Sequence, residues 1–249
     1  MRMCGILPGR SPSQIHYIAA AAAGWAYDTE HKAAIDAGDT DCFVYNRMED
    51  NEADTVVVEY VNTYNGVASA NTSNLNATGK FGDGFYTNTT YYYTIDDDTM
   101  DGTFNSACGA NLTIEIWFKC DLSDWSTGGY QCLWYIRYDA SNHFSLYYWQ
   151  GTDQIQWYMK AGGDSGDVLY WNVGTGTDTT DWQHFAVTRS VASDNFKTFL
   201  NGSLVSTHNG LGTWSGATQT WNIGSDSSNN AEPDGTLDEF AVSNVIRYT

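Results

Sequence analysis

Apolar and polar residues alternate along three segments in the C-terminal third of the chain. In the first of them, Phe185 and Val187 fall in one phase, while His184 and Ala186 fall in the other. Alternation with a period of two is typical of an antiparallel strand that buries one face and exposes the other. The pattern therefore predicts a half-buried strand here.

The second segment predicts a hairpin. Residues 196–200 alternate in the same way, and Asn201 and Gly202 follow at once, before a second apolar run that begins at residues 204–205. An Asn-Gly pair between two such runs favours a type I′ turn, because both central residues of that turn need a positive φ.

The third segment, residues 237–243, predicts the last strand. Its alternation places Asp238 in phase with Phe240 and Val242, and hence on the core side, with Glu239 solvated on the opposite face. A buried carboxylate costs several kcal/mol unless a cation or backbone N–H groups satisfy it. Asp238 is therefore a candidate site residue.

The same alternation recurs upstream. Strands are expected at residues 56–60, 91–95, 112–118, 133–138, 144–149 and 155–159. Short strands separated by Gly-rich turns predict an all-β, two-sheet antiparallel sandwich. Residues 11–35 are the one helical candidate, because they are rich in Ala and begin with the Ser-Pro-Ser-Gln start signal.

The order of several short motifs resembles one known family. These are GKFGDGFYT (79–87), LTIEIWFK (112–119), WQHFAVT (182–188), LNG (200–202), IGS (223–225) and GTLDEFAV (235–242). Together they are similar to the laminin G-like domains of the concanavalin A-like lectin–glucanase superfamily. The resemblance spans about residues 43–249 and implies a jelly-roll sandwich domain, preceded by an N-terminal extension at residues 1–42.

The resemblance also implies a structural calcium ion. In such sandwiches calcium often joins an Asp of the last strand to backbone carbonyls of the opening strand and loop. The implied ligands are Asp238, Asp50, Asn51 and Asp83. Carboxylate and carbonyl oxygens suit Ca²⁺. The alternative for Asp238 is a carboxylate that is hydrogen-bonded by loop amides.

Charge excludes some partners. The 249 residues carry a net charge of −19 with 11 Lys and Arg, and no basic cluster stands out along the sequence. Nucleic acids and anionic membranes are therefore poor partners. The acidity favours solubility and is compatible with binding a divalent cation.

No run of the sequence is apolar enough to span a membrane. Residues 15–26 resemble a signal peptide, but their centre is Ala rather than Leu, and the chain retains Met1. We expect no cleaved leader, and an extracellular location reached by another route, such as release of a virion.

Five cysteines are spread along the chain without a C-x-x-C pair: Cys4, Cys42, Cys108, Cys120 and Cys132. This spacing does not predict a zinc knuckle or a redox motif. We expect mostly free, buried thiols, and a disulfide between Cys120 and Cys132 stays open.

Catalytic signals are absent from the sequence. Glycosidases of this superfamily carry paired acids on one strand, because two carboxyl groups must flank the scissile bond. Here Glu115 stands alone on its strand, with Thr113 and Trp117 as same-face neighbours. Glu115 is expected to make a cross-strand polar contact, and His184 to be a packing residue, so we predict no enzyme.

Aromatic residues suggest glycan binding. The chain has ten Trp and seventeen Tyr, and sugar rings stack on aromatic faces while polar neighbours bind the hydroxyls. The expected ligand-binding residues are Trp125, Tyr130, Trp149, Trp157, Trp171 and Trp214. Taken singly, each of them has core packing as the alternative.

These features predict a non-enzymatic structural or adhesive protein of a virion or cell surface, such as a phage decoration or tail component. Its lectin-like domain would bind glycans, and residues 1–42 would bind a second copy or neighbouring subunits. A soluble, secreted carbohydrate-binding module and a glycan-cleaving enzyme are the alternatives.

Overall fold

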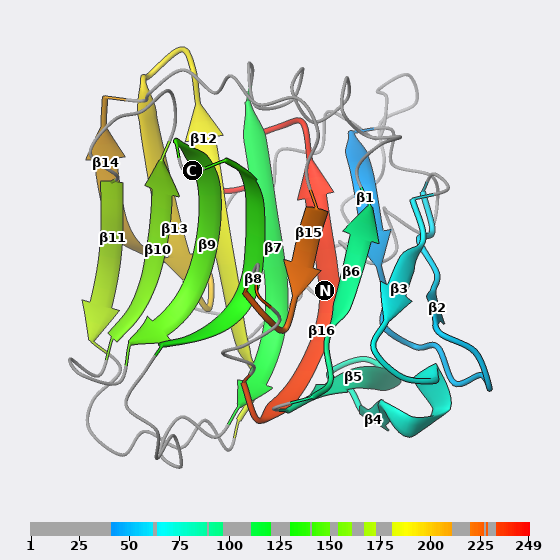
Figure 1. Ribbon diagram of the computed structural model, residues 1–249. Coiled ribbons are helices and arrows are strands. Elements are labelled where there is room, and N and C mark those ends of the chain that lie inside the picture. The colour runs from blue at the N-terminus through cyan, green and yellow to red at the C-terminus, as the bar shows by residue number, and fades with distance from the viewer. Residues whose placement is uncertain are drawn as a thin grey trace, which may run out of the picture.

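Two antiparallel sheets form the molecule. The computed structural model describes residues 41–61, 64–88, 90–96, 111–120, 130–139, 141–149, 154–160, 167–172, 181–210, 220–226, 228 and 233–249. The expected helix, Cys4, Cys108, Trp125 and Trp214 lie outside these residues. The described part is almost entirely strand, so the predicted all-β sandwich is confirmed (Figure 1).

The first sheet contains eight strands. In spatial order they are β14 (Ser203–Asn209), β13 (Asn195–Leu200), β12 (Gln183–Ser190), β7 (Leu112–Cys120), β16 (Gly235–Ser243), β5 (Asp83–Thr87) and β4 (Asn76–Thr78), while β1 (Cys42–Asn46) also pairs with β16. β16 therefore pairs with β5 through Gly235–Leu237 and with β1 through Phe240–Ser243. Its edge changes partner between these two stretches, at Asp238 and Glu239.

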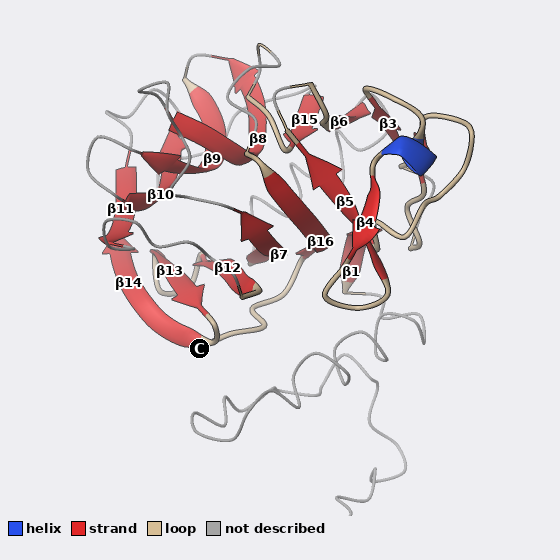
Figure 2. Ribbon diagram, turned by 90° about the horizontal axis from the view of Figure 1, so that it is seen from below, coloured by secondary structure: helices blue, strands red, loops and turns tan. Residues whose placement is uncertain are grey.

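The second sheet also contains eight strands. Their order is β11 (Asp167–Asn172), β10 (Gln154–Lys160), β9 (Asn142–Trp149), β8 (Tyr130–Asp139), β15 (Thr220–Ile223), β6 (Tyr93–Asp96), β3 (Gly66–Ala68) and β2 (Val56–Val57). A single 3₁₀ turn, η2 (Thr72–Asn74), is the one helical element in the described part. Figure 2 shows the two layers from below.

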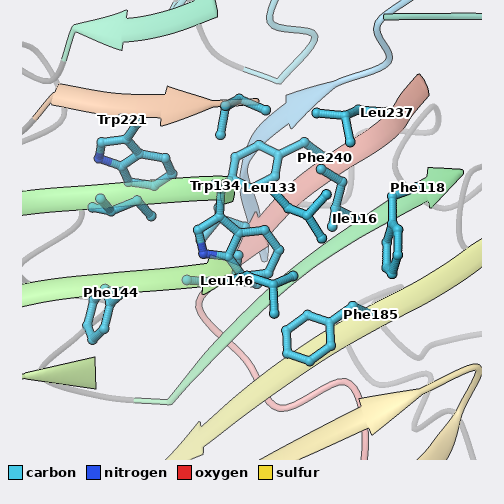
Figure 3. Close-up of a cluster of buried hydrophobic side chains, with 14 of the residues drawn as sticks. Ile116, Phe118, Leu133, Trp134, Phe144, Leu146, Phe185, Trp221, Leu237 and Phe240 are labelled. Carbon is cyan, nitrogen blue, oxygen red and sulfur yellow. The ribbon is translucent and has the colours of Figure 1, made fainter. Parts of the chain in front are cut away.

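Large aromatic side chains fill the space between the sheets. Trp134 of β8 is fully buried and lies 5.5 Å from Phe185 of β12 and 5.9 Å from Phe240 of β16, measured between ring centroids. It thus contacts β12 and β16, the two strands that flank β7 in the opposite sheet (Figure 3). Burial of such rings supplies most of the driving force for folding.

The hairpin prediction is confirmed. β13 and β14 are joined by Asn201 and Gly202, whose φ angles are 49° and 73°. The predicted faces of β12 are also correct, because Phe185 and Val187 belong to the main core while Ala186 lies on the other side of the sheet.

The cysteines that the structure describes follow the expectation of free thiols. Cys42, Cys120 and Cys132 are all buried thiols, and they form no disulfide with one another. The open question of a Cys120–Cys132 disulfide is thereby answered, since neither thiol is bonded to another.

The chain after β16 lies across the outer face of the first sheet. Thr113 Oγ1 donates a hydrogen bond to the carbonyl of Val245 at 2.6 Å, and the Arg247 amide donates to Thr113 Oγ1 at 3.1 Å. Tyr248 then packs on Phe199, with ring centroids 5.4 Å apart. No helix within the described residues has the length and apolar character needed to cross a membrane.

Candidate functional site

Three aromatic side chains gather on the outer face of the second sheet. On β9 the buried residues Phe144, Leu146 and Tyr148 face the core, so Tyr147 and Trp149 face outward. β8 pairs with β9 so that Tyr130 lies directly opposite Trp149. We call Tyr130, Tyr147 and Trp149 the aromatic platform.

The platform rings are close and partly exposed. Tyr130 and Trp149 are nearly parallel, with an interplanar angle of 3° and centroids 6.1 Å apart. Tyr147 lies 5.6 Å from Tyr130 and 6.3 Å from Trp149. The exposed fractions of Tyr130 and Trp149 are 39% and 40%. Much of both rings is therefore available to a ligand.

Amide side chains of β10 border the platform. Gln154 lies opposite Trp149 and Gln156 opposite Tyr147. The Tyr147 hydroxyl donates to Gln156 Oε1 at 2.9 Å, and Gln156 Nε2 donates to Gln154 Oε1 at 3.1 Å. Amides both donate and accept, as sugar hydroxyls require of their partners.

A carboxylate fixes the other side of the platform. The Tyr130 hydroxyl donates to Asp226 Oδ2 at 2.9 Å, and the Ser228 amide donates to Asp226 Oδ1 at 2.7 Å. Burial, followed by the bond to Asp226, raises the pKa of Tyr130, while burial raises the pKa of Tyr147 to about 12. Both hydroxyls therefore stay protonated and neutral.

The structure separates the residues that the sequence predicts as glycan ligands. It brings Tyr130 and Trp149 together. The prediction for Trp157 is wrong, because its ring is 1% exposed and packs at 5.8 Å on Trp134 in the core. Trp171 is on β11, where the structure describes the backbone alone, and Trp125 and Trp214 lie outside the described residues.

Tyr147, Gln154 and Gln156 are site residues that were not predicted from the sequence. The alternation of Phe144, Leu146 and Tyr148 already sets the phase of β9 and so places Tyr147 outward. The partners on β10 required the register, which the sequence does not specify.

Asp238 occupies a different face from the predicted one. Leu237 and Phe240 both belong to the core, and Asp238 lies opposite Trp117 on the outer side of the first sheet. The phase changes because β16 has a bulge between Asp238 and Ala241, with Glu239 at φ 53°. One extra residue in a strand reverses the alternation beyond it.

Asp238 is nevertheless fully buried. Its Oδ2 accepts hydrogen bonds from the backbone amides of Lys80 and Phe81, at 2.7 and 2.9 Å. Its Oδ1 is also buried, and no described group donates a hydrogen bond to it. Burial and the nearby Glu239 carboxyl raise its pKa to about 8, against the lowering effect of the backbone amides of Phe81, Lys80 and Glu239.

Two glycines allow the loop to approach this carboxylate. A Cβ on Gly79 would lie 2.3 Å from the Asp83 carbonyl oxygen and 2.8 Å from Asp238 Oδ2. A Cβ on Gly84 would lie 2.8 Å from the Gly79 Cα. A side chain at either position is therefore sterically excluded.

The acidic side chains among the predicted calcium ligands, Asp50, Asp83 and Asp238, do not converge on one point. Asp50 Oδ2 accepts from the Val58 amide at 3.1 Å, and Asn51 is exposed. Within the described ranges, no three His, Cys, Asp or Glu residues converge on a possible metal position. Asp238 can still serve as a ligand, since its buried Oδ1 needs either a proton or a cation, and backbone carbonyls would then supply the other ligands.

Two further acids are buried. Glu239, which the sequence predicts to be solvated, is 8% exposed and accepts a hydrogen bond from the Tyr45 hydroxyl, because the bulge turns it toward β1. Glu115 makes the expected cross-strand contact, since its Oε2 lies 3.4 Å from His184 Nε2 and accepts from the Tyr248 hydroxyl at 2.5 Å.

Solved structures with the same fold include carbohydrate-binding domains. Domain 4 of AbnA, an extracellular arabinanase of Geobacillus stearothermophilus solved with arabinotriose, matches with a TM-score of 0.56 and 14% identity over 81% of this chain and 91% of that one. The binding domain of botulinum neurotoxin DC, solved in complex with rat synaptotagmin II, matches with a TM-score of 0.62 and 10% identity over 83% of this chain and 48% of that one. A structure of botulinum neurotoxin type C, whose cell entry depends on interaction with two ganglioside molecules, matches with a TM-score of 0.62 and 12% identity over 86% of this chain and 49% of that one.

The chain spans about half the length of the matched neurotoxin chains, and identities this low show the fold alone. No curated protein sequence matches the chain. The family model described as the concanavalin A-like lectin/glucanases superfamily matches residues 87–247, which is more than half of the chain. This chain therefore belongs to the concanavalin A-like lectin/glucanase superfamily, in its laminin G-like branch.

Proposed function

We propose that this protein binds glycans through the aromatic platform and does not cleave them. The observation that carries the proposal is the pair of parallel, partly exposed rings of Tyr130 and Trp149 beside the amides of β10. Sugars present apolar C–H faces that stack on such rings, while amides and a fixed carboxylate bind the hydroxyls. Similar domains that were solved with arabinotriose, or described as interacting with gangliosides, support the ligand class.

The burial of Glu115 favours binding over cleavage. Asp238 lies opposite Trp117, two residues from Glu115 on the same face of the sheet, so the two acids are diagonal neighbours. Their exposed fractions are 0% and 3%, and Tyr248 and the loop at Lys80 bond to them. A glycosidase pair must instead flank a substrate bond, with the carboxyl groups about 5–9.5 Å apart.

A glycan array tests the proposal. The wild-type protein is expected to bind a defined set of glycans, and Trp149→Ala and Tyr130→Ala should each weaken that binding at least about ten-fold, since each removes a stacking surface. Tyr60→Ala is the matched control, because Tyr60 is 48% exposed and lies away from the platform, beside Arg47. Equal losses in all three variants, or no binding by the wild type, would refute the proposal.

We also propose an extracellular role as a structural or adhesive component of a virion or cell surface, with residues 1–42 as the assembly arm. The Ala-rich composition of that segment supports it. Analytical ultracentrifugation of the full chain and of a variant lacking residues 1–41 tests it. An oligomer that persists after the deletion, or a full chain that is monomeric, would contradict the arm.

A secreted carbohydrate-binding module is the second candidate. It is favoured by the match to a domain of an extracellular arabinanase over 91% of that domain. This candidate predicts glycan binding by a monomer.

We further propose that Asp238 Oδ1 is the carboxylate ligand of a structural calcium ion, with backbone carbonyls as its partners. The support is the buried Oδ1, to which no described donor bonds. Such an ion would replace the proton that burial otherwise imposes on this carboxyl.

A further inference from the structure

The outer face of the second sheet continues beyond the platform. Strand register aligns four successive rows of outward side chains across β8, β9 and β10. These rows are Tyr130–Trp149–Gln154, Cys132–Tyr147–Gln156, Tyr135–Ser145–Tyr158 and Arg137–His143–Lys160. The first two rows contain the aromatic platform, whereas the fourth row consists of basic side chains.

We call Arg137, His143 and Lys160 the basic row. Arg137 and Lys160 pair with His143 from its two sides, so three side chains that can carry positive charge are cross-strand neighbours. Directly opposite side chains in a sheet have Cβ atoms about 4.5–5.5 Å apart. One group of suitable size can therefore contact all three.

The composition of the chain makes this cluster informative. The protein has 11 Lys and Arg against 30 Asp and Glu, yet two of these few basic side chains flank one His in a single row. Such an arrangement in so acidic a chain favours a local anion site over general surface charge. Contacts of an anionic group with Arg and Lys act at short range, whereas salt screens its repulsion by acids farther away than a Debye length.

Aromatic rings join the basic row to the platform. The His143 ring stacks on Tyr158 and on Tyr135, with centroid distances of 4.9 and 5.9 Å and interplanar angles of 20° in both pairs. These tyrosines lie in the third row, next to Tyr147 of the second. The face is therefore a continuous aromatic track that ends at positive charge.

The two ends of the track differ in charge and are well separated. Asp226 is bonded to Tyr130 at the platform end, while the basic row lies at the other end. Trp149 lies six positions after His143 on β9, which is about 20 Å of strand. That length exceeds one sugar ring, so a single ligand that reaches both ends has to be an oligosaccharide.

We propose that the ligand of this face is an acidic oligosaccharide, a proposal that rests on the proposed glycan-binding function. It lies along β9 with an uncharged sugar ring on the aromatic platform and a carboxylate or sulfate group at the basic row. Asp226 sets the direction, because it repels an acidic group at the platform end. Arg137 supplies paired N–H donors for planar carboxylate, and Lys160 adds a point charge.

The test uses probe pairs that differ only in charge. Tetragalacturonate is compared with its methyl ester, and a heparin tetrasaccharide with its desulfated form, so the two arms distinguish carboxylate from sulfate. The variants are Arg137→Gln/Lys160→Gln and, as a matched control, Lys119→Gln/Lys197→Gln. The control removes the same charge from the first sheet, on β7 and β13. Affinities come from titration calorimetry, and an array of neutral and acidic glycans extends the comparison.

The wild type is expected to bind the acidic member of one probe pair, or of the array, at least about ten-fold more tightly than its neutral counterpart. Arg137→Gln/Lys160→Gln should lose that preference and keep the binding of neutral ligands, while the control keeps both. The preference should also shrink between about 0.1 M and about 1 M salt, where the Debye length falls from about 10 Å to about 3 Å.

Other results overturn the inference. Glycan binding that depends on Trp149 but shows no acid preference would refute the acidic ligand and leave the proposed function standing. A preference that survives Arg137→Gln/Lys160→Gln, or tighter binding of a homopolymeric RNA than of any acidic glycan, would also refute it. No glycan binding at all would refute the proposed function and this inference together.

Discussion

The buried carboxyl of Asp238 gives the protein a predictable pH dependence. Burial, followed by repulsion from Glu239, raises its pKa from 3.8 to about 8 in the native state. Below about pH 4 the group is protonated in both native and unfolded chains. Between these two values the native state holds a proton that the unfolded chain releases, so the free energy of unfolding falls as the pH rises.

The size of this effect follows from the shift. The difference between 3.8 and about 8 is about 4 pKa units, and each unit corresponds to about 1.4 kcal/mol. This sets an upper limit on the order of 6 kcal/mol, which is lost between about pH 4 and about pH 8. Such a loss is comparable to the whole stability of many domains, which is about 5–15 kcal/mol.

Asp238→Asn tests the reasoning, because an amide has the same shape, cannot ionise and can still accept the Lys80 and Phe81 amides. In the presence of a chelator, urea denaturation at about pH 5 and about pH 8 should show a smaller loss of stability in Asp238→Asn than in the wild type. The variant should be the more stable protein at the higher pH. Asp181→Asn, at an exposed site, is the control.

Parallel pH profiles for wild type and Asp238→Asn would refute the account of a buried, raised carboxyl. Calcium provides a second readout. If Asp238 holds the ion, added calcium stabilises the wild type by about 2.7 kcal/mol at 100 times the Kd, and it leaves Asp238→Asn unchanged. Equal stabilisation of both proteins would place any calcium elsewhere.

Two other substitutions test the first sheet. Glu115→Gln is expected to destabilise the protein by about 1.5–3 kcal/mol in urea titrations, because it weakens the buried hydrogen bond that Glu115 accepts from Tyr248. The affinity for glycans should stay unchanged. A loss of glycan binding with intact stability would instead indicate that Glu115 is a functional acid. Gly79→Ala should cost about 1–3 kcal/mol or more, since its Cβ would meet the Asp83 carbonyl at 2.3 Å. Gly210→Ala, where no atom lies within 4 Å and φ is 86°, measures backbone strain without a clash. A Gly79→Ala variant as stable as the wild type would contradict the close packing around Asp238.

Local patterns in the sequence were sufficient to predict most of the fold. The alternation in β12 and the Asn201-Gly202 turn depend on neighbouring residues, and both are confirmed. The face of Asp238 could not be predicted in the same way. Its phase depends on a bulge at the place where β16 changes partner from β5 to β1, and no local pattern signals that change.

The sequence predicted only part of the candidate site, again because local patterns do not specify strand register. Tyr130 and Trp149 were identified as aromatic residues near polar loops, and the structure places them side by side. Trp157 also has polar neighbours in the sequence, but its side chain falls in the inward phase of β10, together with Ile155 and Met159. The basic row could not be predicted from the sequence. Its members, Arg137, His143 and Lys160, lie on three different strands and become neighbours only through strand register.

The most direct test of the glycan-binding claim is a crystal structure of the protein with its strongest ligand from the array. The account predicts a sugar ring stacked on Trp149 and Tyr130, with hydroxyls bonded to Gln154 or Gln156 and the rest of the ligand running along β9 toward Arg137 and Lys160. A sugar bound on the outer face of the first sheet, with the platform left untouched, would contradict it.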